Sequence, residues 1–345
     1  MGRRFMIIGG AGFMGSNFVR HLIKEIGDIE VLVYDKLTYA GRLESLRDLI
    51  NMKNLKFTRA DLCDEENLTK TIEGFDPEII VNFAAETHVD RSINEPAPFL
   101  KTNILGVFTL LEVVRRREVP LVIHISTDEV YGDLWNIQPA NERSPLIPSN
   151  PYSASKASGD LLAQAYWKTY RLPIIIVRPS NNYGPYQYPE KLIPKTIIRA
   201  LHNMPVPVYG DGMQIRDWLY VKDFCEALNV IIERGKKGEV YNVPGLNERR
   251  NIEVVRDILK LLGKQLSLIK FVEDRPGHDK RYAMKGDKIL ALGWRPKTPW
   301  SEGLRMTVEW YMNNEWWWKP LLSDRYFQID TPWGGERGAS SRYWS

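Results

Sequence analysis

Two adjacent carboxyl groups, Asp128 and Glu129, follow the apolar run of residues 121–125, and Tyr152 and Lys156 come soon after them. A tyrosine activated by a lysine can remove a hydroxyl proton while hydride leaves the same carbon, which is the chemistry of a nicotinamide-dependent oxidation. Such an oxidation needs no carboxyl pair, whereas two carboxyl groups can supply an acid and a base at once. These residues therefore predict a site that oxidises a substrate, removes water from it and reduces it again.

The tyrosine and the lysine are four residues apart, after Asn150-Pro151, and proline is common in the first turn of a helix. Positions four apart lie on one helix face, so the Lys156 ammonium should lower the pKa of the Tyr152 hydroxyl. Thr127 can hydrogen-bond the hydroxyl that is oxidised. The acidic pair could instead be a helix cap or a solvated pair, but its place at the end of a strand, facing the tyrosine, favours chemistry.

Three glycines follow the first apolar strand and open a helix, in the segment Gly9-Gly-Ala-Gly12-Phe-Met-Gly15. This spacing allows a tight turn and lets backbone N–H groups approach a pyrophosphate at the helix N-terminus. Asp35 ends the second strand, where an acidic residue binds the ribose of a dinucleotide. Its carboxylate would repel the 2′-phosphate of NADP, so NAD is the expected cofactor.

Two further segments follow strands at the same edge of the predicted sheet. Asp61-Leu62 follows the third strand, where the adenine end of a dinucleotide would lie, but Asp61 could equally be an N-terminal helix cap. Ala84-Ala85 follows the fourth strand, and its small side chains would let the backbone run close to a cofactor.

The elements that must position these residues alternate along the first half of the chain. Strands are predicted at residues 5–8, 30–34, 55–58, 79–83, 121–125 and 174–177, with helices near 13–26, 64–73, 97–117 and 151–170 between them. Nearly all-apolar strands in this alternation indicate a parallel sheet covered on both faces. The expected fold class is α/β, a doubly wound parallel Rossmann sheet with a smaller C-terminal substrate-binding lobe.

The rhythm of the chain changes after Pro179, where loops become longer and richer in Pro, Tyr and Asn. Helices are predicted near 191–203, 221–233, 252–262 and 302–313. We therefore expect an NAD-binding domain at 1–178, to which parts of 218–245 return, a nucleotide-sugar-binding lobe at 179–320 and a C-terminal tail at 321–345.

The composition is that of an ordinary globular enzyme, with 43% hydrophobic and 26% charged residues. A net charge of +4 without a dense basic stripe gives no reason to expect nucleic acid. Two cysteines, Cys63 and Cys225, give neither a disulfide framework nor a metal spacing, which suits a reducing cytoplasm. No apolar run approaches the roughly 18 residues that span a bilayer, so no membrane is expected.

Tryptophans cluster at Trp316-Trp-Trp318 and recur at Trp333, which is typical of core or interface packing.

Together these residues resemble the extended short-chain dehydrogenase/reductase family, over nearly the whole chain from Gly9 to about Tyr311. The resemblance is carried by Asp35-Lys-Leu-Thr-Tyr-Ala-Gly41, Ala84-Ala-Glu-Thr-His-Val-Asp-Arg-Ser92, Ser126-Thr-Asp-Glu-Val-Tyr-Gly132, Pro151-Tyr-Ser-Ala-Ser-Lys156, Ser180-Asn-Asn-Tyr-Gly-Pro185 and Asp274-Arg-Pro-Gly-His-Asp279. The glycine motif is shared by the whole superfamily, whereas the Thr-Asp-Glu triplet is more specific to nucleotide-sugar dehydratases. Thr87 stands where Ser is common and Pro179 where Cys is common, and the tryptophan-rich tail departs from the family pattern.

The resemblance implies a conversion of dTDP-glucose to dTDP-4-keto-6-deoxyglucose, with Thr127, Asp128, Glu129, Tyr152 and Lys156 as catalytic residues. Tyr152 would take the 4-hydroxyl proton while the C4 hydride passes to NAD. Glu129 would then remove the C5 proton, Asp128 would protonate the leaving 6-hydroxyl, and hydride would return to C6. Adjacent carboxyls disfavour double ionisation, which allows Asp128 to be protonated while Glu129 is ionised.

The resemblance also implies binding residues for the cofactor and the substrate. The cofactor set is Gly9, Gly12, Phe13, Met14, Gly15, Asp35, Lys36, Leu37, Thr38, Asp61, Leu62, Ala84, Ala85, Thr87, Thr102, Tyr152, Lys156 and Asn182. The substrate set is Thr87, His88, Thr127, Asn181, Lys191, Leu192, Pro207, Tyr209, Arg216, Asn251, Arg275 and His278. Arg216 and Arg275 could chelate the diphosphate, whereas Tyr209 could be loop packing and Lys191 a solvated helix start. No histidine shows metal-ligand spacing, so no metal is expected.

A homodimer through the helices near 97–117 and 151–170 is implied by the resemblance alone. Two other kinds of function stay open. A UDP-sugar 4-epimerase or decarboxylase would keep the fold, but 4-epimerases lack the acidic pair and sugar decarboxylases usually have Ser at the position of Asp128. A dinucleotide-binding regulatory or scaffold protein would have no use for Thr127, Tyr152 and Lys156. The bases thymine and uracil differ by one methyl group, and no single residue reads it out.

Overall fold

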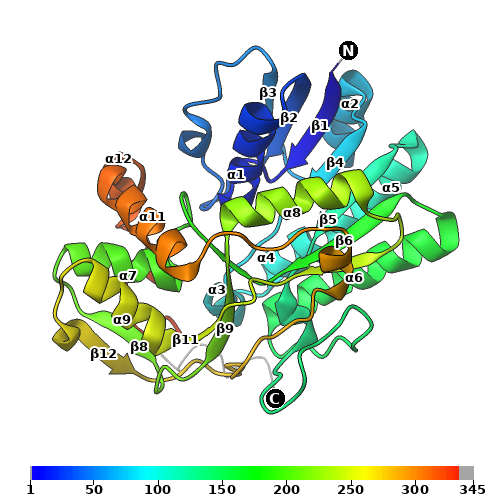
Figure 1. Ribbon diagram of the computed structural model, residues 1–345. Coiled ribbons are helices and arrows are strands. Elements are labelled where there is room, and N and C mark those ends of the chain that lie inside the picture. Colours follow the sequence, from blue (N-terminus) through cyan, green and yellow to red (C-terminus); the bar gives the residue numbers. More distant parts are fainter. Residues whose placement is uncertain (1, 334–345) are drawn as a thin grey trace, which may run out of the picture.

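A seven-stranded parallel sheet lies at the centre of the computed structural model, which describes residues 2–333 (Figure 1). The strands lie in the order β10-β6-β5-β4-β1-β2-β3. They are β1 (Arg3–Ile8), β2 (Ile29–Asp35), β3 (Leu55–Arg59), β4 (Ile79–Asn82), β5 (Leu121–Ile125), β6 (Ile174–Pro179) and β10 (Val240–Val243). The chain order reverses between β1 and β4, and ligands of doubly wound sheets bind at the carboxyl edge of such a switch point. The predicted α/β class is confirmed.

Helices cover both faces of this sheet, which explains why its strands are apolar almost throughout. Successive side chains of a strand point to opposite faces, so Phe5 and Ile7 of β1 join one core while Met6 and Ile8 join the other. The first core contains residues of α1 (Phe13–His21) and α8 (Val221–Arg234). The second contains residues of α2 (Glu65–Phe75), α5 (Val107–Arg117) and α6 (Pro151–Tyr170).

One helical stretch, Ala97–Arg117, is 21 residues long and, with a mean hydropathy of 1.4, apolar enough to cross a membrane by length and composition. The prediction that no run approaches this length was wrong. Lys101 and its polar neighbours interrupt the apolar residues, so the stretch does not read as one apolar run in the sequence. Half of its most apolar window is buried inside the protein, and the stretch packs against α2 and α6. A buried core helix passes the same test, so the stretch is weak evidence for a membrane span.

A smaller lobe lies beside the carboxyl edge of the sheet (Figure 1). Its helices α7 (Leu192–Leu201), α9 (Asn251–Leu261) and α11 (Trp300–Asn313) share one apolar core. Two small sheets complete it, one of β11 (Glu248–Arg250), β9 (Ile215–Tyr220) and β7 (Asn181–Tyr183), the other of β12 (Ile269–Val272) and β8 (Val206–Tyr209). The short elements of the chain are η1 (Leu22–Ile26), η2 (Leu43–Leu46), α3 (Val89–Asn94), α4 (Ala97–Leu100), η3 (Lys101–Gly106), η4 (Asp128–Tyr131), η5 (Leu266–Leu268), α10 (Asp287–Ala291), α12 (Glu315–Trp318), η6 (Lys319–Leu321) and α13 (Arg325–Gln328).

The tryptophan cluster contributes to the core of this lobe. Trp317 and Trp318 are buried there, whereas Trp316 is 40% exposed. Trp318 Nε1 donates to the Tyr311 carbonyl at 2.7 Å. Trp333 ends the described chain, with its ring edge-on to Tyr209 at 4.5 Å between centroids. The predicted tail at 321–345 therefore lies partly outside the described residues.

Candidate active site

A cavity of about 260 Å³ opens at the carboxyl edge of the sheet, beside the switch point. Its floor is built from glycines that no other residue could replace. A Cβ on Gly15 would lie 2.3 Å from the Gly9 carbonyl, and a Cβ on Gly9, whose φ is +74°, would lie 2.6 Å from Ala84 N. The backbone at the start of α1 therefore forms an open cradle that suits a pyrophosphate.

Asp35 is held at the wall of this cavity by backbone donors. Ala11 N donates to its Oδ2 at 2.9 Å and Leu37 N to its Oδ1 at 2.8 Å. A Cβ on Gly41 would lie 2.6 Å from Oδ1, so a glycine is needed there too. Burial raises the pKa of Asp35, and the two N–H donors oppose that rise. The carboxylate is thus fixed where a ribose-binding acid is required.

Asp61 also lines the cavity, and the alternative that it caps a helix is wrong. Asp64 caps α2 instead, because its side chain accepts from Asn67 N at 3.1 Å. Asp61 Oδ1 accepts from Cys63 N at 3.0 Å, and its Oδ2 pairs with Lys36 Nζ at 2.7 Å.

Nearly all predicted cofactor residues line the same cavity. These are Gly9, Gly12, Phe13, Met14, Gly15, Asp35, Lys36, Thr38, Asp61, Leu62, Ala84, Ala85, Thr87, Thr102, Tyr152, Lys156 and Asn182. Leu37 does not, and it contributes through its backbone N–H to Asp35.

The five candidate catalytic residues lie on the wall of this cavity as well. Thr127 is the N-cap of η4, where its Oγ1 accepts from Glu129 N at 3.3 Å and donates to Asp128 Oδ1 at 3.2 Å. The acidic pair therefore occupies the first turn of η4 and is not itself the cap. Asp128 is buried and Glu129 is partly buried, so the pair is not a solvated one either.

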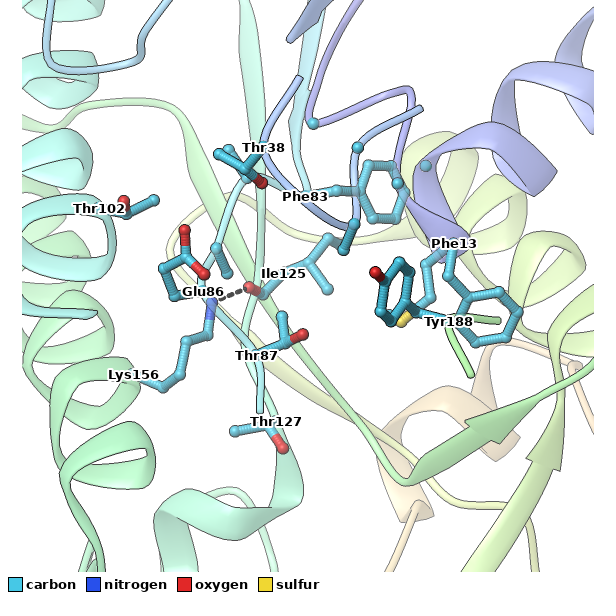
Figure 2. A pocket seen from close by; sticks show the side chains of 18 of the residues that line it. Phe13, Thr38, Phe83, Glu86, Thr87, Thr102, Ile125, Thr127, Lys156 and Tyr188 are labelled. Carbon is cyan, nitrogen blue, oxygen red and sulfur yellow. Dashed lines mark hydrogen bonds between the residues drawn. The ribbon is translucent and has the colours of Figure 1, made fainter. Parts of the chain in front are cut away.

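Helix α6 positions the tyrosine and the lysine. Asn150 and Ser153 form a reciprocal capping box around Pro151, which fixes the start of the helix. Tyr152 and Lys156 are both buried, and Lys156 Nζ donates to the Ile125 carbonyl at 2.7 Å (Figure 2). Burial lowers the pKa of Lys156 to about 8.

The prediction that Lys156 lowers the pKa of Tyr152 was wrong. Burial raises the pKa of Tyr152, and the Glu129 and Asp128 carboxyls add to the rise, while a hydrogen bond with Thr127 opposes it. The Lys156 ammonium is engaged with the Ile125 carbonyl instead.

The two carboxyls of the acidic pair have different electrostatic surroundings. Burial raises the pKa of Asp128 well above its ordinary range, and the charge of Glu129 adds to the rise. Burial also raises the pKa of Glu129, but Arg275, Arg216 and Lys191 all oppose it. Asp128 is thus the better placed to hold a proton, and Glu129 to be ionised.

A second cavity of about 170 Å³ continues from the first, and the two share Glu129, Asn181, Asn182, Gln187, Glu190 and Lys191 in their walls. Most predicted substrate residues line it: His88, Asn181, Lys191, Leu192, Pro207, Tyr209, Arg216, Asn251, Arg275 and His278. The remaining two, Thr87 and Thr127, line the first cavity.

The second cavity suits an anionic, polar ligand. Arg216 and Arg275 bring two guanidinium groups to its wall, and Lys191 Nζ, which donates to the Thr87 carbonyl at 2.7 Å, adds a third cation. Within residues 2–333, Asn251 Oδ1, Asn181 Oδ1 and Arg275 Nε are buried without a hydrogen-bond partner. Buried polar atoms are rarely left unpaired, so these atoms are available to a ligand.

The sequence prediction missed several residues of these walls, among them Asp90 and Tyr282. Asp90 is buried, and accepts from Tyr209 Oη at 3.0 Å and from Arg275 Nη1 at 3.1 Å. Its place in the stretch Ala84–Ser92 was a signal that could have found it. Tyr282 contacts Glu129 but follows the last motif of the chain, so only the tertiary structure identifies it.

Comparison with known proteins agrees with this geometry. The family model for GDP-mannose 4,6 dehydratase matches residues 6–307. A probable dTDP-glucose 4,6-dehydratase from Sinorhizobium fredii is 48% identical, over 94% of this chain and 97% of its own. The crystal structure of a dTDP-glucose 4,6-dehydratase from Streptomyces venezuelae, with NAD and TDP bound, has a TM-score of 0.89 at 43% identity, covering 92% of this chain and 99% of that one.

A UDP-glucose 4-epimerase from Thermus thermophilus, in complex with NAD, is more distant, with 31% identity and a TM-score of 0.84 over 90% of this chain and 99% of that one. The epimerases share the fold, and the dehydratases share more of the sequence. The chain belongs to the dTDP-glucose 4,6-dehydratase family, within the extended short-chain dehydrogenases/reductases.

Proposed function

We propose that this protein is an NAD-dependent hydro-lyase that converts dTDP-glucose to dTDP-4-keto-6-deoxyglucose. The observation that carries the proposal is the place of the acidic pair. Asp128 and Glu129 lie with Tyr152 on the wall of the first cavity, and Glu129 also lines the second cavity, to which Arg216 and Arg275 belong. An oxidation alone would leave this pair without a role.

The first cavity fits NAD. The glycine cradle at the start of α1 accepts the pyrophosphate, and Asp35 is fixed to accept from a ribose hydroxyl. When bound, NAD supplies an acceptor for the C4 hydride of the sugar and a donor of hydride to C6. Lys156 is placed to hold the nicotinamide ribose, and Asn182 Oδ1, buried without a partner among the described residues, is free to bind it too.

The chain's own residues move the protons. Thr127 orients the sugar 4-hydroxyl, and Tyr152 takes its proton during oxidation at C4. The resulting ketone acidifies the C5 proton, which Glu129 removes. Asp128 protonates the departing 6-hydroxyl, so that water leaves, and Glu129 later returns a proton to C5. Arg216 and Arg275 bind the diphosphate.

The alternative of a UDP-sugar 4-epimerase or decarboxylase has less support. Asp128 stands at the position where decarboxylases usually have Ser, and epimerases lack the pair. The third possibility, a dinucleotide-binding regulatory protein, leaves the buried Tyr152, Lys156 and Thr127 unexplained.

We also propose a cytoplasmic homodimer. The proposed division of the chain is a cofactor domain at 1–178, to which parts of 218–245 return, a substrate lobe at 179–320 and a C-terminal tail at 321–345. Support for the dimer comes from an apolar surface on the helices of residues 97–117 and α6. Leu105 and Leu161 are each 57% exposed there, and Leu100 and Phe108 are 49% and 44% exposed. These side chains lie on helices that pack against one another, and a second copy of the chain would cover them.

Incubation of the purified protein with dTDP-glucose tests the proposed function, with UDP-glucose run in parallel. Mass spectrometry should find the loss of one water from dTDP-glucose, and the ratio of the two rates measures the preference for the base. An unchanged mass with a changed sugar configuration would establish the epimerase instead. NAD binding without turnover of either sugar would favour the regulatory protein.

A further inference from the structure

Tyr282 bridges two carboxyl groups at the wall of the substrate cavity. Its hydroxyl oxygen lies 2.6 Å from Asp279 Oδ2 and 3.2 Å from Glu129 Oε2. Tyr282 and Asp279 are almost fully buried, with exposed fractions of 2% and 3%. Neither residue has a part in the proton transfers described above, although Tyr282 contacts the proposed base.

The direction of the hydrogen bonds follows from the number of protons. A tyrosine hydroxyl has one proton and can also accept, so Tyr282 can donate to only one of the two carboxyl groups at a time. The shorter contact makes Asp279 the acceptor, since hydrogen bonds of this length to a carboxylate are strong. Tyr282 Oη then presents a lone pair to Glu129, and can accept from Glu129 only when that carboxyl carries a proton.

This arrangement favours the protonated form of Glu129, which is the form that Glu129 takes once it has removed the C5 proton. An ionised Glu129 gains no hydrogen bond from Tyr282 in this direction, whereas a protonated one does. The charge of Asp279 acts in the same sense as burial on the pKa of Glu129, against Arg275, Arg216 and Lys191. A base that takes a proton from carbon must bind it firmly, so the contact strengthens Glu129 in that role and holds its carboxyl in place once the proton has been taken.

We propose that Tyr282 and Asp279 are positioning residues for Glu129 in the removal of the C5 proton, an inference that rests on the proposed function. In this step the C5–H bond breaks and its proton goes to Glu129. The electron pair forms the C5–C6 double bond, the C6–O bond breaks, and Asp128 gives its proton to the leaving hydroxyl. Tyr282 keeps its own proton on the bond to Asp279 and exchanges no atom with the sugar.

The hydroxyl can be removed without disturbing the diphosphate side of the cavity. The Arg216 guanidinium carbon lies 4.1 Å from the centroid of the Tyr282 ring, and Arg216 Nη2 donates to the backbone carbonyl of Asp279 at 2.9 Å. Tyr282→Phe keeps the ring under Arg216, and Asp279→Asn keeps the carbonyl. Both variants should therefore bind dTDP-glucose almost as the wild type does.

The test compares Tyr282→Phe and Asp279→Asn with the wild type, on dTDP-glucose and on its C5-deuterated form. Tyr241→Phe is the matched control, because the Tyr241 hydroxyl accepts from Lys236 N at 2.9 Å and lines neither of the two cavities. We expect kcat of Tyr282→Phe to fall by about tenfold or more and KM to stay within about twofold. The C5 isotope effect on kcat should rise and reduced nicotinamide should accumulate, because C5 proton removal becomes the slow step.

Asp279→Asn should change kcat and the isotope effect in the same direction, and Tyr241→Phe should change neither. A wild-type kcat and isotope effect in both site variants would overturn the inference, as would a rise in KM alone. If one variant does not fold, the other still decides the matter. A wild type that leaves dTDP-glucose unchanged would instead overturn the proposed function, and the parallel assay distinguishes that failure from the first.

Discussion

Asp128 and Glu129 are neighbours in the chain, but their carboxyl groups have different partners. Asp128 Oδ1 accepts from the Thr127 hydroxyl at 3.2 Å, and its buried Oδ2 has no partner within residues 2–333. Glu129 Oε2 lies 3.2 Å from the Tyr282 hydroxyl. Three cations, Arg275, Arg216 and Lys191, stabilise the negative charge of Glu129 against burial. One turn of η4 thus holds a carboxyl whose pKa is raised well above its usual range beside one whose rise three cations oppose.

Asp128→Asn and Glu129→Gln should separate oxidation from elimination. Each should lower the rate of water loss by about 10²-fold or more, because one of the two proton transfers has lost its group. Thr127, Tyr152 and Lys156 stay intact, so the 4-hydroxyl should still be oxidised. The measurement is the absorbance of reduced nicotinamide after addition of dTDP-glucose, with the mass of the sugar. Tyr152→Phe is the control that should lose both signals, and water loss at the wild-type rate in either carboxyl variant would contradict the assignment.

Lys156 should be destabilising near neutral pH, although turnover requires it. Its pKa is about 8 in the folded protein against an ordinary 10.5, because burial disfavours the ammonium. The unfolded chain therefore binds more protons between these two values, and the free energy of unfolding should rise with pH across that window. Below it, Lys156→Met should be more stable than the wild type by about 1–3 kcal/mol.

Urea unfolding below and above this window measures the effect of Lys156→Met. The advantage of the variant should shrink at the higher pH, where the wild-type lysine is neutral in both states. Lys222→Met, at a lysine whose side chain is 59% exposed, should show no such difference. A Lys156→Met protein that is less stable at neutral pH would contradict the prediction.

Asp90 should control substrate affinity without acting on the reacting carbons. It accepts from both Tyr209 and Arg275, and after burial its charge is the largest influence on the pKa of Arg275, which it raises. Asp90→Asn removes that charge and leaves the guanidinium less well fixed, at a cost of about 1.5–3 kcal/mol for a charge-assisted hydrogen bond. We expect KM for dTDP-glucose to rise by about 10–100-fold, with kcat within about threefold.

Steady-state kinetics of Asp90→Asn decides this, with Asp48→Asn as the control. Asp48 also pairs with an arginine, Arg20 at 2.6 Å, but on the surface. A fall in kcat at unchanged KM in Asp90→Asn would place Asp90 with the proton-transfer groups instead.

Local patterns explain how much of the fold the sequence predicts. Most strands of the main sheet are largely apolar runs, and the cradle depends on glycines close in sequence, so both leave a clear signal, although β10 was not predicted as a strand. The pairs β11·β9 and β12·β8 leave none, because charged residues or a proline interrupt the apolar residues of these short strands. Asp61 and Asp64 are both plausible caps in the sequence, and only the backbone geometry chooses Asp64.

In the candidate site, too, the sequence predicts residues that are close in the chain but not contacts between distant segments. Tyr152 and Lys156 share a helix face that their spacing predicts. The ammonium of Lys156 nevertheless goes to the Ile125 carbonyl, 31 positions away in the sequence. Tyr282 and Glu129 are 153 positions apart, and their contact depends on how the lobe packs against the sheet. Contacts of this kind have no sequence period, so no motif predicts them.

Charge on the apolar surface of the helices should abolish the proposed homodimer. Leu105→Glu with Phe108→Glu places two carboxylates where a second copy would bury them, and an unpaired buried charge costs several kcal/mol. Light scattering after size-exclusion chromatography should find a dimer for the wild type and a monomer for the double variant. Leu266→Glu is the control, because Leu266 is 56% exposed on η5 in the other lobe. A wild-type monomer, or a dimer that persists in the double variant, would contradict the proposal.

The tryptophan triplet offers a comparison within one turn of chain. Trp318 is fully buried, donates to the Tyr311 carbonyl at 2.7 Å and packs against His202, so Trp318→Ala should cost about 3–5 kcal/mol of stability. Trp316 is 40% exposed and lies over Arg47, so Trp316→Ala should cost less than about 1 kcal/mol. Denaturant unfolding of both variants measures the difference. Equal losses would mean that the triplet acts as a surface cluster and not as the end of the lobe's core, because burial is the property in which these two neighbours differ most.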